Sequence, residues 1–362
     1  MFLQLNHLIT DTSWLDLLRR SASWLLSRRP VCRGMRLWYG GMGSILTLHR
    51  VVSNAQETLI EQNLDLEVTE QALKDLIERF EGNGYEFISI EELYQRLIHQ
   101  KTKHRRSIVL TFDDGYKDNL TLAYPILKRK KIPFCLYVTT DFPNAKARLW
   151  WYALEGLILS QKQINFDFNG GSYLWKLNTP KERNTAFNEI KCLLLANSSH
   201  QEEIFSKLGL KTDIFFQLSQ KLCLSWDEIK KLAEDPLVTI GAHTTTHRRL
   251  SALTEAELQF EIQNSKSELE KKLGINIIHF SYPFGDRDSC GPREFKAVEA
   301  AGFKTAVTSR EGNIQYRHKE NNYTLPRFLV GGGRFFLPNK LELNMSGYRL
   351  LRAHQFNRLV CD

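Results

Sequence analysis

Two neighbouring carboxylates, Asp113 and Asp114, are the first residues whose position suggests chemistry. They follow the apolar run 107–112 directly and are followed by Gly115. Two charges at the end of a buried strand are costly unless a cation compensates them. Consecutive strand side chains point to opposite faces, so one carboxylate can bind a metal while the other faces water or substrate. An Asp-Asp-Gly triplet alone is more often a surface turn, so this hypothesis needs support from elsewhere in the chain.

A pair of histidines gives that support. His243 and His247 follow the apolar run 237–241, and a spacing of four places both imidazoles on one face if the segment turns helically. Imidazole with carboxylate suits Zn²⁺ or a neighbouring first-row divalent ion. One carboxylate and two imidazoles leave positions open for water and substrate, as in a catalytic site. The two motifs together therefore predict a catalytic divalent metal centre.

The turn from Tyr282 to Gly285 is the third candidate, since it ends the apolar run 277–282. A backbone N–H exposed at such a turn can point at the oxyanion that develops when water attacks an acyl group. Without the carboxylates and histidines, an ordinary strand-terminating turn would be the better interpretation. With them, the three motifs predict metal-assisted hydrolysis.

The elements that must position these residues alternate between strand and helix. This alternation predicts an α/β fold with a parallel sheet, whose strand ends hold the active site. The predicted strands cover 44–52, 87–90, 107–112, 133–139, 237–241, 277–282 and 303–308, and the predicted helices cover 69–82, 91–99, 119–130, 254–273 and 292–301. All the candidate residues lie where predicted strands end.

The pattern changes between 148 and 224, where Trp150 and Trp151 open a stretch rich in Leu, Lys and Glu. Its periodicity is helical and strand signals are few, so we predict a mostly helical insertion that could cap the substrate. The insertion interrupts a catalytic domain that we place at 44–335, and 336–362 forms a tail.

The amino-terminal segment 1–43 is basic and amphipathic. The chain has a net charge of +8, and its first 50 residues hold seven arginines against Asp11 and Asp16. Trp and Leu alternate with these arginines, which suits either an interfacial helix on anionic lipid or a helix packed on the main domain. We predict no signal peptide, no transmembrane helix and no nucleic-acid partner.

The cysteines contain no C-x-x-C pair and no disulfide-framework spacing. They are Cys32, Cys135, Cys192, Cys223, Cys290 and Cys361. Isolated reduced thiols favour a cytoplasmic protein, or one that lies peripherally at the inner membrane face.

Taken in this order, the segments from Thr111 to Gly115, from His243 to His247 and from Tyr282 to Gly285 resemble the polysaccharide deacetylase (NodB homology) family of carbohydrate esterases. The resemblance covers roughly residues 45 to 330. It implies a distorted (β/α) barrel, a divalent metal ion that is usually zinc, and an N-acylated carbohydrate substrate. It also implies that Asp114, His243 and His247 bind the metal, that Asp113 is the general base, and that the Phe284 N–H helps hold the oxyanion.

The sequence departs from the family at two positions. Many members have Arg where this chain has Ser281, so we expect Arg327 to brace the catalytic aspartate instead. No clear Leu-x-His supplies the usual general acid near the end of the domain. Some members supply it from the first strand, which makes His49 our candidate acid, with a hydrogen-bonded core histidine as the alternative and His279 and His318 next to be tried.

Substrate contacts are expected from residues near these motifs, namely Tyr116, Trp151, Tyr282, Pro283 and Arg327. The sequence leaves two other functions open. One is deacylation, for example deformylation, of a lipid-linked sugar at a membrane surface, and the other is carbohydrate binding without catalysis. The presence of Asp113 argues against the second, because a non-catalytic relative has little need of a general base.

Overall fold

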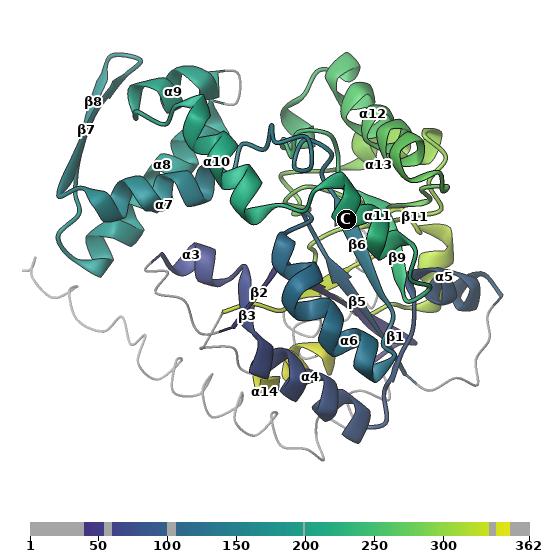
Figure 1. The fold of residues 1–362 in the computed structure, drawn as a ribbon. Coiled ribbons are helices and arrows are strands. Elements are labelled where there is room, and N and C mark those ends of the chain that lie inside the picture. The colour runs from purple at the N-terminus through teal and green to yellow at the C-terminus, as the bar shows by residue number, and fades with distance from the viewer. Residues whose placement is uncertain (1–39, 54–59, 100–105, 198–199, 333–337, 348–362) are drawn as a thin grey trace, which may run out of the picture.

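The computed structural model describes residues 40–53, 60–99, 106–197, 200–332 and 338–347 (Figure 1). The predicted interfacial or packed helix in the amino-terminal segment lies outside these residues. So does most of the predicted tail, apart from the helix α14 (Pro338–Met345). Among the helices that the structure describes, none is long and apolar enough to cross a membrane.

A parallel sheet curls into a nearly closed barrel. Its strands run in the order β11 (Thr305–Val307), β10 (His279–Ser281), β9 (Val238–Ala242), β6 (Phe134–Val138), β5 (Ser107–Phe112), β1 (Gly43–Leu48) and β12 (Arg327–Leu329), and β4 (Glu86–Phe87) pairs with the start of β5. A parallel bridge between Val307 and Leu325, two residues before β12, draws the two ends of the sheet together. The predicted distorted (β/α) barrel is confirmed.

Helices cover the outside of the barrel (Figure 1). They are α4 (Glu70–Gly82), α5 (Ile90–Ile98), α6 (Tyr124–Lys130), α11 (Trp226–Ala233), α12 (Glu255–Leu273) and α13 (Pro292–Ala300). Capping fixes the ends of α12: Thr254 and Glu257 form a capping box, and Gly274 ends the helix with φ 70°. The helix predicted over 119–130 begins as a π-helical turn, Asn119–Ala123, before it continues as α6. Two 3₁₀ turns span Leu250–Ala252 and Tyr316–Glu320.

The strand predicted over 44–52 is broken. β1 ends at Leu48, and β2 (Arg50–Val52) leaves the barrel to pair with β3 (Glu67–Thr69), which follows the short helix α3 (Glu61–Leu64). The apolar pattern missed the break because both pieces are buried. The break leaves His49 between the two strands, at the end of β1.

The insertion forms a second lobe with its own apolar core. Its elements are α7 (Trp150–Ser160), β7 (Gln163–Phe168), β8 (Gly171–Lys176), α8 (Pro180–Ala196), α9 (Gln201–Lys207) and α10 (Thr212–Leu222). The prediction of a mostly helical segment missed the β7–β8 hairpin. The sequence did carry the signal, because 163–168 alternates polar and apolar residues and is followed by Asn169-Gly170, a dipeptide typical of hairpin turns. In the structure both turn residues have positive φ.

Candidate active site

The carboxyl ends of several barrel strands meet around one cavity of about 430 Å³. Because the strands are parallel, the residues that follow β1, β5, β9 and β10 all lie at the same end of the barrel. The cavity is lined from these four strand ends by His49, Asp113, Asp114, His243, His247, Tyr282 and Phe284. Residues more than 200 positions apart in the chain therefore line the same cavity, as expected for residues at the ends of parallel strands.

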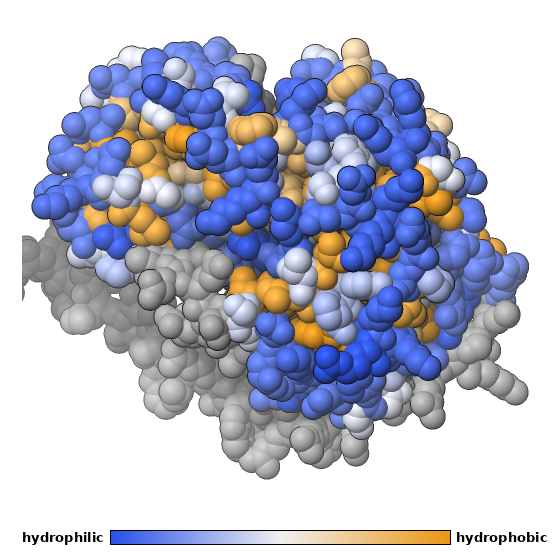
Figure 2. All heavy atoms as spheres, viewed as in Figure 1, coloured by the Kyte–Doolittle hydropathy of each residue, from blue (hydrophilic) through white to orange (hydrophobic). Residues whose placement is uncertain are grey.

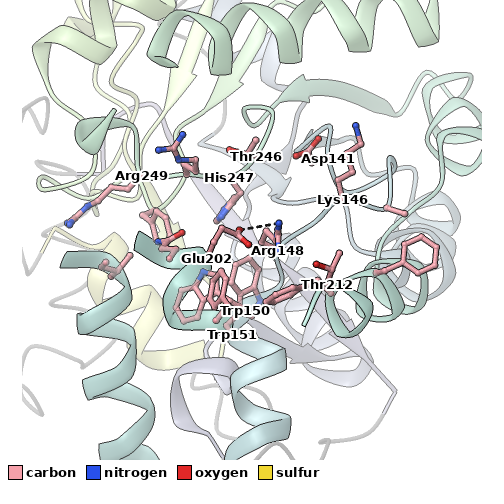
Figure 3. Close-up of a pocket in the computed structure, with 18 of the residues that line it drawn as sticks. Asp141, Lys146, Arg148, Trp150, Trp151, Glu202, Thr212, Thr246, His247 and Arg249 are labelled. Atoms are coloured by element: carbon pink, nitrogen blue, oxygen red, sulfur yellow. Dashed lines mark ion pairs between the residues drawn. The ribbon is translucent and has the colours of Figure 1, made fainter. Parts of the chain in front are cut away.

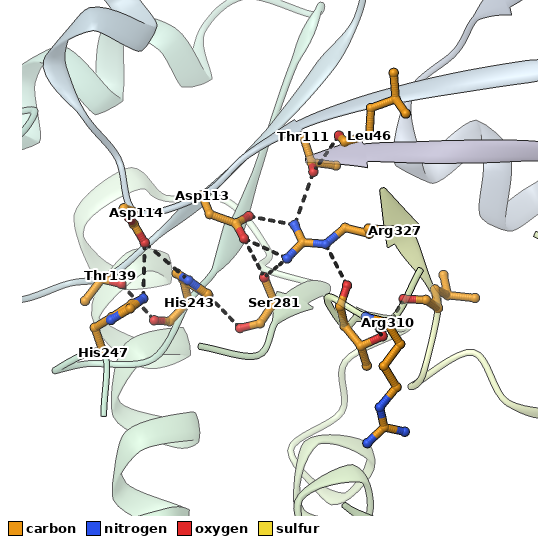
Figure 4. Close-up of polar contacts among 12 residues, drawn as sticks. Leu46, Thr111, Asp113, Asp114, Thr139, His243, His247, Ser281, Arg310 and Arg327 are labelled. Atoms are coloured by element: carbon orange, nitrogen blue, oxygen red, sulfur yellow. Dashed lines mark hydrogen bonds and ion pairs between the residues drawn. The ribbon is translucent and has the colours of Figure 1, made fainter. Parts of the chain in front are cut away.

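Asp114, His243 and His247 converge on one point (Figure 4). The Nε2 atoms of the two histidines lie 3.4 and 3.3 Å from the same oxygen of Asp114, Oδ1. That buried oxygen has no hydrogen-bond donor among the described residues. Nδ1 of His243 lies 2.7 Å from the carbonyl oxygen of Ser281, which as acceptor fixes the proton on Nδ1 and leaves the Nε2 lone pair facing Asp114. Asp114, His243 and His247 therefore form a candidate site for a divalent cation.

The segment that carries the two histidines is a loop, and the helical turn assumed from their spacing is wrong. Thr244 and His247 both have positive φ, 65° and 61°. Glu261 of α12 holds the loop, because one of its oxygens accepts from the backbone N–H groups of Thr245 and Thr246, each at 2.9 Å. The imidazoles still meet, with ring centroids 5.0 Å apart.

Left-handed backbone is concentrated at this site. Besides Thr244 and His247, Asp114 and Phe284 have φ of 76° and 62°. Each non-glycine residue in this region costs on the order of 1 to 3 kcal/mol, and such residues cluster where function demands a particular geometry. The strained backbone therefore lowers the free energy of unfolding, and in return it orients these side chains and the turn at Phe284.

Asp113 is bound by Arg327 through two hydrogen bonds, at 2.8 and 2.7 Å (Figure 4). The same guanidinium donates to Thr111 Oγ1, the Thr308 carbonyl and Ser281 Oγ. Burial alone would raise the pKa of Asp113, but Arg327 and the neighbouring histidines hold it below its usual value. Arg327 thus makes the bracing contact expected where Ser281 replaces arginine. It also lines the cavity, and its predicted contact with substrate stays a prediction.

His49 lines the same cavity, and its Nδ1 has no partner among the described residues. Its carbonyl accepts from Asn119 Nδ2 at 2.8 Å, which fixes the backbone at the break between β1 and β2. Burial lowers the pKa of His49, while Asp114 and Asp113 oppose that shift. The other two candidate acids lie elsewhere: His279 contacts Thr305 and Glu91, His318 contacts Gln315, and neither lines the cavity.

The predicted substrate contacts divide into two groups. Trp151 and Tyr282 line the cavity, but Tyr116 and Pro283 do not, and both are buried. The Tyr116 hydroxyl instead lies 3.2 Å from Nε1 of Trp151 and accepts its hydrogen bond. The predicted contact of Tyr116 and Pro283 with substrate stays a prediction. Tyr116, which follows the Asp-Asp-Gly turn directly, packs into the apolar core of the insertion.

A second cavity, of about 540 Å³, adjoins the first (Figure 3). The two share Trp150, Trp151, His247 and Phe284. Residues of the insertion form one wall and the barrel loops form the other, and the space-filling view shows the surface hollowed between these two lobes (Figure 2). The insertion therefore shapes the approach to the candidate site.

Phe187 and Lys191 of α8 also line the first cavity, and the sequence analysis missed both. Their helical spacing of four was visible, but only packing shows which face of α8 turns toward the barrel. Four cysteines lie among the described residues, and all four are free thiols.

This chain belongs to the polysaccharide deacetylase family, whose sequence model matches residues 100–165 and 196–306. The family consists of hydrolases that act on carbon–nitrogen bonds other than peptide bonds. A curated relative is the putative polysaccharide deacetylase YxkH of Bacillus subtilis (strain 168), which is 22% identical over 254 residues, or 69% of this chain. The match spans 61% of that relative's length.

Solved structures share the fold. The deacetylase PplD of Streptococcus pyogenes, in complex with acetate, superposes with a TM-score of 0.54 at 19% identity, over 84% of this chain and 97% of PplD. A de-N-acetylase from Aggregatibacter actinomycetemcomitans gives 0.53 at 14% identity, over 83% and 98%. At these identities the likeness establishes the barrel fold alone.

Proposed function

We propose that this chain is a metal-dependent hydrolase that removes an N-acyl group, acetyl in the first instance, from an amino sugar in an oligosaccharide or polysaccharide. The family supports deacetylation of an acetylated sugar. One observation carries the rest of the proposal: Nε2 of His243 and Nε2 of His247 lie 3.4 and 3.3 Å from the same carboxylate oxygen of Asp114.

The donor set fits a divalent ion. The three ligand atoms lie within 4.8 Å of one another and are largely buried. Two imidazoles and one carboxylate suit zinc and leave positions for water and substrate. A divalent ion held there would polarise the acyl carbonyl and make water acidic enough to attack near neutral pH.

Asp113 is placed to accept the proton of the attacking water. Its contact with Arg327 keeps the carboxylate ionised and fixes its orientation, as a general base requires. As the water oxygen bonds to the acyl carbon, negative charge develops on the carbonyl oxygen. The Phe284 N–H would stabilise that charge, a contribution of about 3 to 4 kcal/mol for one such donor.

His49 would give a proton to the amine as the carbon–nitrogen bond breaks. Burial disfavours its charged form, whereas the two neighbouring carboxylates favour it. The products are a free amino sugar and a carboxylate. Asp113 takes one proton from the water, His49 gives one to the nitrogen, and the carboxylic acid releases the second water proton to solvent. The proton on Asp113 then passes to His49 through solvent, which restores both residues. A carbohydrate-binding protein without catalysis would need neither the base nor its brace.

A lipid-linked sugar is the second candidate substrate. The arginine-rich segment 1–43 favours it, because such a segment can bind anionic lipid and bring the barrel to a membrane surface. The chemistry proposed for the acyl group is the same in both cases.

The experiment that tests the proposal combines metal analysis with turnover. The purified full-length chain should contain about one equivalent of a divalent metal and release free amine from N-acetylated oligosaccharides. His243→Ala and His247→Ala should lose metal and activity together, because each removes a ligand. His99→Ala, at the exposed end of α5, is the control and should behave as wild type. Full metal content in both ligand variants would refute the site.

A further inference from the structure

Lys191 is a half-buried ammonium group at the wall of the catalytic cavity. It comes from α8, which lies mostly in the stretch 166–195 that the family model leaves unmatched. The insertion of this chain therefore adds a charge that the common family core does not supply.

The hydrogen-bond partner of Lys191 is neutral, although two carboxylates, Asp65 and Glu311, line the same cavity. Nζ donates to Oε1 of Gln62 at 2.8 Å, and Gln62 of α3 is neutral. Within the part of the chain that the structure describes, no carboxylate lies within the 4.0 Å of an ion pair from this nitrogen. An ammonium group has three N–H donors, so two remain for other partners. Burial disfavours the charged form and lowers the pKa of Lys191, although Cys192, Asp286 and Asp65 oppose the shift.

The position of Lys191 is fixed by contacts between α8 and α3. Gln62 also donates from Nε2 to Asn188, one turn before Lys191, and Asn184 accepts from the backbone N–H of Glu61 at 2.8 Å. These contacts tie the insertion to the segment between β2 and β3, which follows the first barrel strand. Lys191 is thus held at the rim of the cavity, whereas a free surface lysine would be mobile.

The other cationic group of this cavity is already used. Arg327 lines it, but the guanidinium is bound by Asp113. Lys191 is therefore the cation that remains for a ligand among the described lining residues. Phe187 lies one turn earlier on α8, and Trp150 and Trp151 also line the cavity, so apolar surface for a sugar ring lies in the same cavity.

We propose that Lys191 binds an anionic group of the substrate, a phosphate or a carboxylate carried on or next to the acylated amino sugar. This inference rests on the proposed function and narrows it from N-acylated sugars in general to acidic ones. A phosphate would come from a sugar phosphate or its lipid ester, and a carboxylate from a uronic acid or a lactyl ether. Gln62 holds the ammonium in place, and Lys191 supplies charge and two donors.

Binding measurements test this proposal without requiring turnover. The probes are glucosamine 1-phosphate, the disaccharide of glucosamine with glucuronic acid, and methyl glucosaminide, each titrated into the full-length protein in a calorimeter. Methyl glucosaminide has the same amine but no anionic group, and in this sense is the neutral probe. Lys191→Met should weaken binding of at least one anionic probe by roughly 10- to 100-fold, the usual worth of a charged hydrogen bond. Binding of the neutral probe should change less than about twofold, within the range of a surface substitution.

Two further variants make the outcome unambiguous. Lys191→Arg keeps the charge and should keep most of the affinity for the anionic probes. Lys181→Met removes an exposed lysine from the first turn of the same helix and should change nothing. If only the phosphate probe loses affinity in Lys191→Met, the group that Lys191 binds is a phosphate, and if only the glucuronic acid probe does, it is a carboxylate. Equal affinity of Lys191→Met and wild type for both anionic probes would overturn the proposal, as would an equal loss for the neutral probe.

The N-acetylated forms of the same probes separate this inference from the proposed function. If wild type binds the anionic probes through Lys191 but deacetylates none of the acetylated forms, the catalytic proposal fails and the anionic site stands. If it deacetylates neutral and anionic forms with the same kcat/KM, and Lys191→Met does likewise, the catalytic proposal stands and the anionic site fails.

Discussion

The guanidinium of Arg327 and the carboxylate of Asp113 face each other through two parallel hydrogen bonds of 2.8 and 2.7 Å, although the two residues are 214 positions apart in the chain. Both side chains are almost completely buried. A bidentate contact fixes the plane of the carboxylate as well as its charge. The barrel therefore holds its proposed base in one orientation next to the proposed metal ligands.

Replacing Arg327 with lysine tests this brace. Lysine keeps the charge but cannot form the two parallel bonds, so Asp113 should become less strongly oriented and its pKa should rise. We expect a loss of turnover of about tenfold or more, with normal metal content, and the acid limb of the kcat/KM profile should move to higher pH. A pH–rate profile measures this shift.

The control for that experiment is Arg79→Lys, which alters an ion pair to Glu342 far from the cavity. Arg327→Met is a poorer test, because leaving Asp113 buried without its partner should cost about 3 to 5 kcal/mol of stability. An unchanged acid limb in Arg327→Lys would show that Asp113 does not need this contact.

The two adjacent aspartates should respond differently to conversion to asparagine. Asp113→Asn should retain the metal and lose most turnover, because an amide cannot accept the proton of water. Asp114→Asn should weaken metal binding itself, because it removes a charged ligand. Elemental analysis beside amine-release assays distinguishes the two outcomes. Equal metal loss in both variants would contradict the separate roles.

His49→Ala tests the proposed general acid. Turnover of an amide substrate should fall by about 10²- to 10⁴-fold while metal content stays near normal. The loss should be smaller for an ester with a good leaving group, because that group departs without needing a proton. The comparison of amide and ester rates is the measurement, with His99→Ala as the matched control. If amide turnover is unchanged, His49 is a core histidine and the acid lies elsewhere.

The buried carboxyl of Glu67 should make the free energy of unfolding depend on pH, whether or not a metal ion is bound. Its side chain is 1% exposed, and its Oε1 lies 3.4 Å from Arg50. Burial raises the pKa of Glu67 to about 7 from 4.5, although Arg50 opposes the shift. Between these two values the folded state holds the proton that the unfolded state has lost, so stability falls as pH rises through this window.

Glu67→Gln should remove that dependence. Relative to wild type, the variant should gain about 1 to 3 kcal/mol of unfolding free energy between pH 4.5 and pH 7. Denaturant unfolding at several pH values measures the difference. Glu78→Gln, an exposed substitution on α4, should show no comparable change. A constant difference between Glu67→Gln and wild type across the window would argue against a buried, protonated Glu67.

The family resemblance implied the barrel, whereas the sequence patterns by themselves determined the parallel α/β architecture and the strand ends that carry Asp113, Asp114, His243 and His247. These features are encoded locally: apolar runs of strand length mark buried strands, and parallel strands present their carboxyl ends at one edge. The same local reasoning predicted α12 to within one residue, because its caps lie in the adjacent sequence. The β7–β8 hairpin was also encoded locally but was missed.

Only the tertiary structure decided which distant segments meet. Closure of the barrel brings β12 beside β1 and thereby places Arg327 against Asp113. Contacts between α8 and α3 hold Lys191 at the cavity, and packing against the insertion buries Tyr116. Periodicity specifies which face of an element is buried but not what it is buried against, because the partner of a buried face is chosen by the packing of the whole chain.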